Sequence, residues 1–405
     1  MNVVFLSNFY PRCKRDYYLS RSKSGLAAAA DAHQYAIAQG LKSANRSLQI
    51  INLPSVFPFP HRNKDLFVVD EEIQENGLVI HNVGSCNLAF YQYISRYHHS
   101  KAALKKVVEE NSDITYIVVY ATNLAFLRAA TEVRKKYNHV RICLIVPDLP
   151  DDMTSNKFAQ IRQWISKVFF KSYEEYMSQF DSYVLLTKSM ADRIGCKEGA
   201  FIVNEGVYDE GDSSRSISTS QNEDFTIFYS GMMYRKFGVM NLVEAVHRMK
   251  NEKVKLVLCG YGESVDEIKT LSKTDNRINY LGIISRDEAL KYQSQADLLV
   301  NPRIPDQNPF TKYSFPSKNL EYLASGTPTL LYQLEGIPSE YYNYCYYLDD
   351  EHTDVESLQI MIEEIMSVPY EGRKKKAMIA REFVLNNKNA KKAGEAIVEL
   401  LKSNI

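Results

Sequence analysis

The alternation of short apolar runs with helical stretches constrains this chain more than any other feature. In the first half, apolar runs at residues 2–7, 114–120 and 141–146 are separated by helical patterns such as 25–40, 88–110 and 124–137. Continuous apolar strands are typical of parallel sheets that helices cover on both faces. The first half is therefore predicted to be an α/β domain, and further strands are expected at 47–53, 78–83 and 182–187.

A polar segment at 209–224 (DEGDSSRSISTSQNED) interrupts the alternation, which then restarts. We expect strands at 225–230, 254–259, 279–281, 297–301 and 329–331, with helices between them and three helices at the end. The prediction is an α/β protein of two doubly wound domains with a cleft between them. Residues 1–208 form the first domain, 209–224 a linker and 225–385 the second domain. A last helix at 386–405 could cross back to the first domain.

Composition excludes several classes of protein. Lys plus Arg and Asp plus Glu both number 49, so the chain lacks the basic surplus of a protein that coats nucleic acid. No apolar run approaches the roughly 18 residues of a spanning helix, and the N-terminus is interpreted as a strand, not a signal peptide. The six cysteines lack the close spacing of zinc or redox motifs, which favours a reducing cytoplasm.

The most informative stretch is 301–328, NPRIPDQNPFTKYSFPSKNLEYLASGTP. A proline-containing loop leads to a predicted helix at 317–325 that ends at Gly326. Backbone amides at the start of that helix would suit a diphosphate, and Glu321 lies one turn beyond Lys318, where it could accept hydrogen bonds from ribose. The alternative is an ordinary helix cap with a solvated glutamate. The residues expected at this point are Ser314, Phe315, Pro316, Ser317 and Lys318.

A short glycine motif follows the strand expected at 254–259. Gly260 and Gly262 flank Tyr261, and glycines there would let a ligand approach the backbone. The motif lacks the full dinucleotide fingerprint, so a nicotinamide cofactor is not favoured.

Several segments resemble glycosyltransferase family 4, the retaining "group 1" transferases of GT-B fold. The signature LEYLASGTP after KYSFPSK resembles the family's donor-site motif. Further pieces occur in the family's order: FYSGMMYRKFGVMNLVEA, VKLVLCGYGES and INYLGIISRDEALKYQSQADLLVNPR. SYVLLTKSMADRI and FIVNEGV resemble the end of its acceptor domain. The resemblance implies a GT-B fold with two Rossmann-like domains facing across a cleft.

The resemblance also implies roles for residues, with three departures. The second Glu of the family's E-x7-E motif falls on Glu321, which would bind the ribose, whereas the first falls on Tyr313. The family's diphosphate-binding Arg and Lys fall on Met232 and Phe237. Either the basic residues of the same loop take over their role, or Lys318 and Lys312 do. Those loop residues are Arg235 and Lys236, and a solvated charge pair is their alternative reading.

Other donor contacts are implied at Ser24, Gly25, Gly231, Gly260, Tyr261 and Ile283. For Ile283, packing at the end of a strand is an equal alternative. On the acceptor side, Asp148 in VPDLPDDM is the preferred polar contact to the transferred sugar, with Asp151 and Asp152 as competitors and a solvated proline turn as the alternative.

Residues 157–171 (KFAQIRQWISKVFFK) combine four basic residues with an apolar face at helical spacing. This pattern fits a helix at the membrane surface or an ordinary core helix. A membrane helix would suit a lipid-linked acceptor, which is common in the family, and would place the protein at the inner face of the membrane.

The expected reaction is transfer of a sugar from a UDP- or GDP-sugar to a glycan or lipid-linked acceptor, in polysaccharide or glycoconjugate synthesis. Asp148, Arg235 and Lys318 are the expected catalytic residues; the last two would stabilise the leaving diphosphate. No acidic pair with D-x-D spacing stands in the candidate loops, so neither a metal nor a cofactor is expected. The departures keep open a catalytically silent partner subunit, and the fold keeps open an epimerase.

Overall fold

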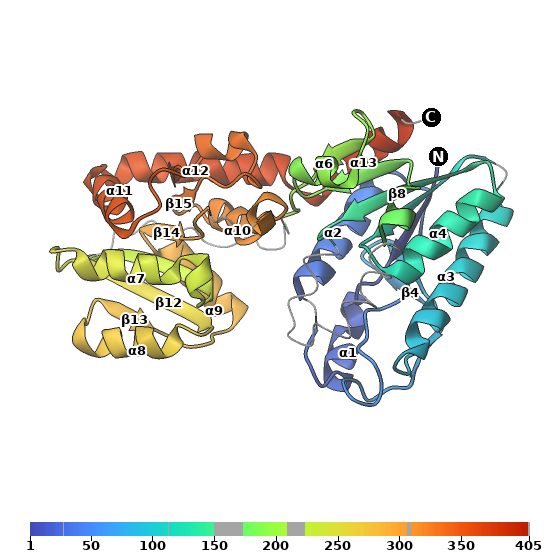
Figure 1. The fold of residues 1–405 in the computed structure, drawn as a ribbon, viewed down its shortest axis with the longest axis horizontal. Helices are drawn as coiled ribbons and strands as arrows, with labels where there is room; N and C mark the ends of the chain where they lie inside the picture. The colour runs from blue at the N-terminus through green and yellow to red at the C-terminus, as the bar shows by residue number, and fades with distance from the viewer. Residues whose placement is uncertain (27, 112, 150–172, 209–222, 306–308, 404–405) are drawn as a thin grey trace. The chain divides into compact units, whose positions relative to one another are not determined.

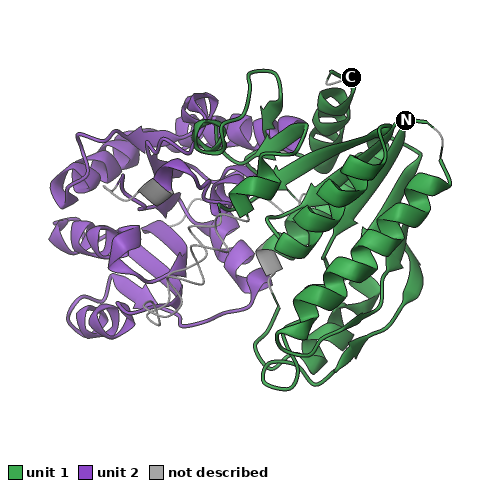
Figure 2. Ribbon diagram, turned by 45° about the vertical axis from the view of Figure 1, so that its right-hand side comes forward, with its two compact units in different colours: residues 1–209, 389–405 green, residues 210–388 purple. Residues whose placement is uncertain are grey.

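The computed structural model describes residues 1–405 except 27, 112, 150–172, 209–222, 306–308 and 404–405. The chain forms two compact units (Figures 1 and 2). Unit 1 comprises Met1–Asp209 and Asn389–Ile405, and unit 2 comprises Glu210–Lys388. The last helix of the chain thus belongs to the same unit as the N-terminus.

Unit 1 is built on an eight-stranded sheet in the order β10-β9-β8-β7-β1-β2-β5-β4. Its strands pair in parallel, except that β4 pairs antiparallel with β5 at one edge. The strands are β1 (Asn2–Ser7), β2 (Leu48–Asn52), β4 (Glu71–Glu75), β5 (Leu78–Asn82), β7 (Thr115–Tyr120), β8 (Val140–Val146), β9 (Ser182–Leu185) and β10 (Phe201–Val203); β3 (Phe67–Val68) and β6 (Ser85–Cys86) form a separate ribbon. The sequence predicted most of this sheet, but not the antiparallel edge.

The described helices of unit 1 are α1 (Arg15–Arg21), α2 (Ala28–Ala44), α3 (Tyr91–Glu109), α4 (Leu124–Lys136), α6 (Ser189–Ile194) and α13 (Ala390–Ser403). The expectation that the Ala-rich helix ends at Gly40 is wrong, because α2 continues to Ala44. Gly40 instead marks the contact between α2 and α13: a Cβ there would lie 1.9 Å from the carbonyl oxygen of Ala390. The glycine therefore serves close helix packing and not helix termination.

Unit 2 contains a parallel six-stranded sheet in the order β13-β12-β11-β14-β15-β16. Its strands are β11 (Phe225–Met232), β12 (Val254–Tyr261), β13 (Ile278–Tyr280), β14 (Leu298–Asn301), β15 (Thr329–Tyr332) and β16 (Tyr346–Leu348). The helices are α7 (Val239–Arg248), α8 (Val265–Thr274), α9 (Arg286–Gln295), α10 (Lys318–Ala324), α11 (Val355–Ser367) and α12 (Tyr370–Asn387). Numbered along the chain, this order is 3-2-1-4-5-6, which is the Rossmann order.

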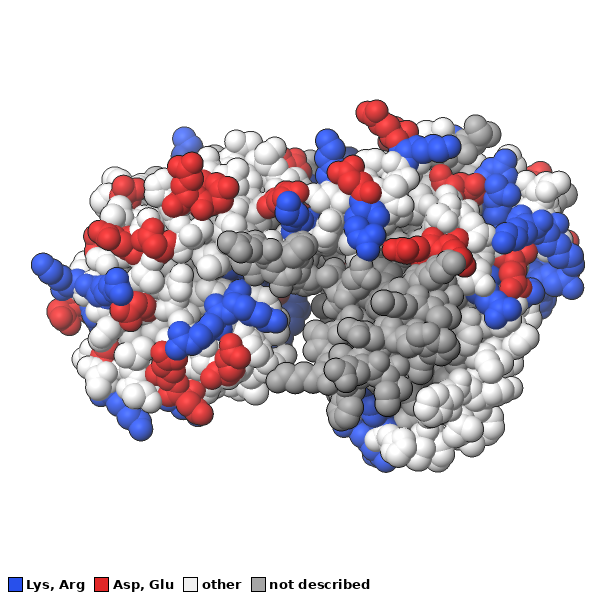
Figure 3. All heavy atoms as spheres, in the orientation of Figure 1, with Lys and Arg blue, Asp and Glu red and all other residues white. Residues whose placement is uncertain are grey.

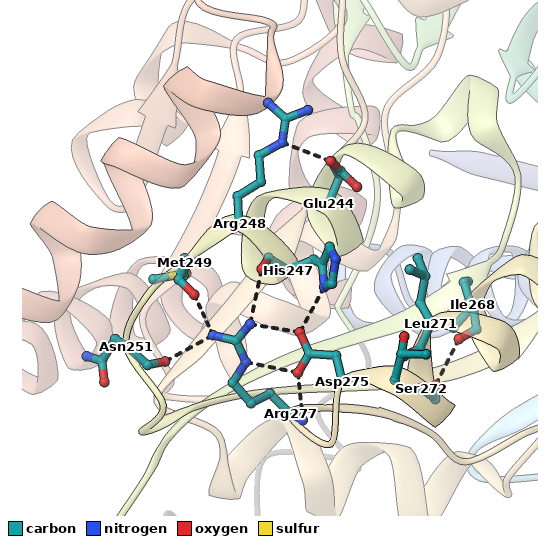
Figure 4. A network of polar contacts seen from close by, with 11 residues as sticks. Glu244, His247, Arg248, Met249, Asn251, Ile268, Leu271, Ser272, Asp275 and Arg277 are labelled. Carbon is teal, nitrogen blue, oxygen red and sulfur yellow. Dashed lines mark hydrogen bonds and ion pairs between the residues drawn. The ribbon is translucent and has the colours of Figure 1, made fainter.

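A buried charge network fastens the amino-terminal edge of the unit 2 sheet (Figure 4). The guanidinium of Arg277 donates to both carboxylate oxygens of Asp275, at 2.9 and 2.7 Å, and to the carbonyl oxygens of His247, Met249 and Asn251. This network joins the end of α7 to the starts of β12 and β13. It therefore stabilises the end of the sheet where the strands begin, opposite their carboxyl ends.

Basic and acidic side chains are interspersed on the face shown in Figure 3, in line with their equal numbers in the sequence. Within the described residues, no helix has both the length and the apolar character needed to cross a membrane.

Candidate functional site

The strand order of unit 2 places its candidate site at the junction of β11 and β14. These strands are neighbours, and the chain proceeds from them toward opposite edges of the sheet. In open parallel sheets, ligands bind beyond the carboxyl ends of strands at such a switch point. The relevant loops therefore begin after Met232 and after Asn301.

Glycines line the carboxyl ends of β11 and β12. Gly231 and Gly260 are register partners in adjacent strands. A Cβ on Gly260 would lie 1.8 Å from the Gly231 carbonyl oxygen, and a Cβ on Gly231 would lie 2.1 Å from Nζ of Lys318. Position 260 therefore needs a residue without a side chain, whereas the glycine at 231 leaves room for the lysine in its observed place.

Lys318, the first residue of α10, reaches back over β11. Its Nζ donates to the carbonyl oxygen of Ser230 at 2.6 Å and lies 4.3 Å from the centre of the Tyr229 ring. Among the described residues it has no second acceptor, which leaves two N–H donors for a ligand. Burial lowers the pKa of Lys318 to about 8, and the negative charge of Glu321 opposes that shift.

Glu321 lies one turn further along α10, with its carboxylate held in place. Its Oε1 accepts from Nε2 of Gln293 at 2.7 Å, and its Oε2 from a guanidinium nitrogen of Arg286 at 3.2 Å. The side chain remains 26% exposed, so its other lone pairs can accept from a ligand. Sequence reasoning missed Gln293 and Arg286; the capping box that opens α9 at Ser285 marks the helix that carries them.

Three large apolar side chains are exposed along the same edge of the sheet. They are Met232 (42% exposed), Tyr261 (57%) and Ile283 (77%), and they follow or end β11, β12 and β13. Exposed apolar groups beside glycines and charged side chains are typical of a small-molecule site, because they can contact the flat face of a ring. The predicted contacts at Tyr261 and Ile283 are thus available to a ligand.

The loop basic residues predicted for the site have partners elsewhere. Arg235 forms an ion pair with Glu267, and Lys236 lies near the rings of Tyr234 and Phe237. Lys312 forms an ion pair with Glu335 at 2.9 Å.

Arg303 is a cation near the site that sequence reasoning missed. It follows β14, donates to Oγ of Ser314 at 3.0 Å and influences the pKa of Lys318. Its position two residues after the strand at the switch point was the available signal.

The segment before α10 is more deeply packed than expected. Phe315 is 7% exposed and its ring contacts Tyr341 at 5.3 Å between centres, so only its backbone can face a ligand. Pro316 is buried, Tyr313 is half-buried and Ser317 is exposed. The amides of Asn319 and Leu320 already donate to the carbonyl oxygens of Pro316 and Ser317. A cradle would therefore use the amides before Asn319.

The remaining predicted residues belong to unit 1. Ser24 and Gly25 form an exposed turn in which Ser22 Oγ donates to the Gly25 carbonyl oxygen at 2.6 Å. Asp148 follows β8 and is exposed. The pKa of Tyr120 is raised mainly by burial of its ring and also by the negative charge of Asp148. Asp151, Asp152 and the segment 157–171 lie outside the described residues.

In the described part of the chain, no group of three or more His, Cys, Asp and Glu side chains could hold a metal ion.

Comparisons with known proteins connect this geometry to one family. Residues 211–383 match the family described as Glycosyl transferases group 1, and no curated protein sequence matches the chain. Three solved structures are similar over almost the whole chain. Anabaena HepE in complex with UDP has 13% identity and a TM-score of 0.62 and is covered over 100% of both chains. Sucrose-phosphate synthase from Thermosynechococcus elongatus has 13% identity and a TM-score of 0.63, covering 99% of this chain and 98% of that one, and the trehalose-6-phosphate synthase OtsA has 11% identity and a TM-score of 0.67, covering 99% of both. HepE has also been solved with UDP and glucose. These findings establish the GT-B fold and support a glycosyltransferase.

Proposed function

We propose that this chain is a retaining glycosyltransferase that moves a sugar from a UDP- or GDP-sugar to a glycan or lipid-linked acceptor. The observation that carries the proposal is the placement of Lys318 over Gly231, with the carboxylate of Glu321 one helical turn further on, at the switch point of unit 2. An ammonium and a carboxylate at that separation suit the diphosphate and the ribose of a nucleotide. UDP in the HepE structures favours uridine as the base.

In the proposed reaction, the bond between the sugar and the diphosphate lengthens and negative charge grows on the leaving oxygen. In this proposal the ammonium of Lys318, which the Ser230 carbonyl oxygen holds at the end of β11, would lie beside that charge and stabilise it electrostatically without reorganisation. Arg303, whose charge lowers the pKa of Lys318, would supply an additional cation in the role expected of Arg235 and Lys236. The proton of the acceptor hydroxyl would pass to the leaving phosphate, with retention of configuration and without a divalent cation.

Several parts of the proposal rest on sequence alone. Asp148 as a contact to the transferred sugar, residues 157–171 as a membrane-surface helix, and a cytoplasmic enzyme of polysaccharide or glycoconjugate synthesis belong to this group. A catalytically silent partner subunit remains the second candidate, because Arg235 and Lys312 are engaged in ion pairs with Glu267 and Glu335. Such a subunit would bind UDP but would neither release it from a UDP-sugar nor transfer the sugar.

The test of the ribose contact compares UDP with 2′,3′-dideoxy-UDP by isothermal titration calorimetry. Hydrogen bonds to a charged group contribute about 1.5–3 kcal/mol, so the native protein should favour UDP by roughly ten- to a hundredfold. Glu321→Ala should remove this preference, and the control Glu363→Ala, on the exposed face of α11, should keep it. Equal binding of the two nucleotides to the native protein would refute the role of Glu321.

A further inference from the structure

Unit 1 contains a pocket that the donor chemistry does not use. Its volume is about 210 Å³, and it is lined by segments that follow β1, β2 and β5, together with β3 and the start of β4. Figure 1 labels α1 and β4, which contribute to it. The pocket therefore lies beyond the carboxyl ends of parallel strands, where α/β sheets bind their ligands.

Aromatic rings form the apolar part of this pocket. Tyr17 and Phe67 are 47% and 64% exposed, although both line it, whereas Tyr18 is only 5% exposed. The Tyr18 ring is fixed between Tyr10 and Tyr17, each with its centre 5.3 Å away. Exposed rings beside a fixed one present flat apolar surface to a ring-shaped ligand.

Two buried polar side chains in the pocket have hydrogen-bonding capacity to spare. Among the described residues, nothing bonds the hydroxyl of Tyr18, although the side chain is almost fully buried. Asn63 is 2% exposed; its Oδ1 accepts from the amide of Asp65 at 2.8 Å, while its Nδ2 donates to no described residue. Neither atom is among the fully buried polar atoms that lack a partner, so both atoms reach the open volume of the pocket and can bond to the hydroxyl groups of a ligand there.

The charged side chains at the pocket are already paired with one another and leave no cation for an anionic ligand. Lys14 is the cation among the lining residues, and it already pairs with Glu71 at 2.9 Å. Asp65 accepts from Nε of Arg21 at 2.8 Å and from the hydroxyl of Tyr17 at 3.0 Å. Both carboxylates keep lone pairs that can accept from hydroxyl groups, and because each cation is already paired with a carboxylate, neither is left over for a phosphate or a uronate.

We propose that this pocket binds a single uncharged pyranose ring, stacked on Tyr17 and Phe67 and hydrogen-bonded to Tyr18, Asn63 and the two carboxylates. Its size fits one ring, since it is smaller than the roughly 300–1,000 Å³ of sites for drug-sized ligands. Its assignment as a subsite for the glycan acceptor rests on the proposed function, while binding of the sugar does not.

Ligand-observed NMR on the full chain tests binding, with the methyl glycosides of glucose, galactose and mannose as neutral probes and methyl glucuronide as the anionic one. At least one neutral glycoside should bind, more tightly than the glucuronide. Tyr18→Phe should weaken it about three- to tenfold, as expected for one lost hydrogen bond, and Phe67→Ala should weaken it further. Phe90→Ala removes an aromatic ring that is 99% exposed outside the pocket and should have no effect.

A UDP titration of the same samples separates this inference from the proposed function. UDP binding without binding of any neutral glycoside would overturn the pocket and leave the donor site intact. Glycoside binding that Tyr18→Phe and Phe67→Ala leave unchanged, or tighter binding of the glucuronide, would also overturn it. Glycoside binding that both variants weaken, in a protein that does not bind UDP, would support the pocket and refute the nucleotide site.

Discussion

At the scale of single residues, the proposed donor site depends on the pairing of a glycine with a lysine from another element. Lys318 occupies the volume that any side chain at position 231 would need, and it does so at the cost of partial desolvation of its ammonium group. The same position that makes the amine available to a diphosphate therefore also lowers its pKa to about 8. A site residue of this kind should show its charge state in the pH dependence of binding.

The first prediction is that UDP affinity falls as the pH rises above about 8, because only protonated Lys318 attracts the diphosphate. One proton is taken up on binding in this range, so the affinity should approach a tenfold decrease per pH unit. Below about 8 the lysine contributes no pH dependence. Calorimetry across this interval measures the effect.

Two variants make this pH prediction specific to Lys318. Arginine keeps its charge at these pH values, so the affinity of Lys318→Arg for UDP should vary little with pH above 8. Lys318→Gln should bind more weakly and equally at each pH. The same sharp loss of affinity in Lys318→Gln would assign the titration to another group.

At the scale of elements, the network around Arg277 shows how unit 2 fixes the edge opposite its candidate site. The side chains of Arg277 and Asp275 are 9% and 7% exposed, and the guanidinium is bonded to a carboxylate and to backbone carbonyl groups. Removing one partner of such a pair leaves the other charge buried without compensation, which is more costly than loss of a surface ion pair.

Arg277→Ala should therefore lower the free energy of unfolding of unit 2 by about 3–5 kcal/mol. Hydrogen exchange at the amides of β12 and β13 measures this locally. Arg248→Ala is the matched control, because this arginine pairs with Glu244 one turn away at the surface and should contribute about 0.3–0.5 kcal/mol. Equal protection in the two variants would count against a special role for the network.

Arg277 lowers the pKa of Asp275, so the stabilisation by this ion pair is present at neutral pH and is lost only in strong acid, as the pH falls through the lowered pKa.

The sequence predicted elements whose pattern is local and missed those that depend on partners. The apolar runs predicted most of the parallel strands to within a few residues, but not the three-residue strands β10 and β16. The loop before α10 was singled out from its own residues. By contrast, β4 (EEIQE) is polar and holds its place by pairing with β5, which no local pattern indicates. Arg303 and Gln293 reach the site only through tertiary contacts with Ser314 and Glu321.

At the scale of the whole molecule, the last helix completes the unit that contains the first strand. Figure 2 shows α13 in the colour of unit 1, and its residues Ile397 and Leu401 are buried in the same core cluster as Val3 and Phe5. The close contact of α13 with α2 is made at glycines on both helices, Gly40 and Gly394. Sequence alone assigns Gly40 to a helix end, because it does not show which helix will pack there.

The contact between these helices predicts opposite effects of one substitution at two helical glycines. A Cβ at Gly394 would lie 2.1 Å from backbone atoms of Gly40, whereas the nearest atom to a Cβ at Gly372 in α12 is a methyl group of Val368 at 3.3 Å. Alanine is favoured over glycine within a helix by about 0.5–1 kcal/mol. Gly372→Ala should thus be neutral or stabilising by up to that amount, while Gly394→Ala should destabilise unit 1 by about 1–3 kcal/mol through forced separation of α2 and α13. Hydrogen exchange of α2 and of α12 reports the two units separately. A stabilising effect of Gly394→Ala on α2 would mean that the two helices can move apart without loss of packing, and that the C-terminal segment contributes little to the stability of unit 1.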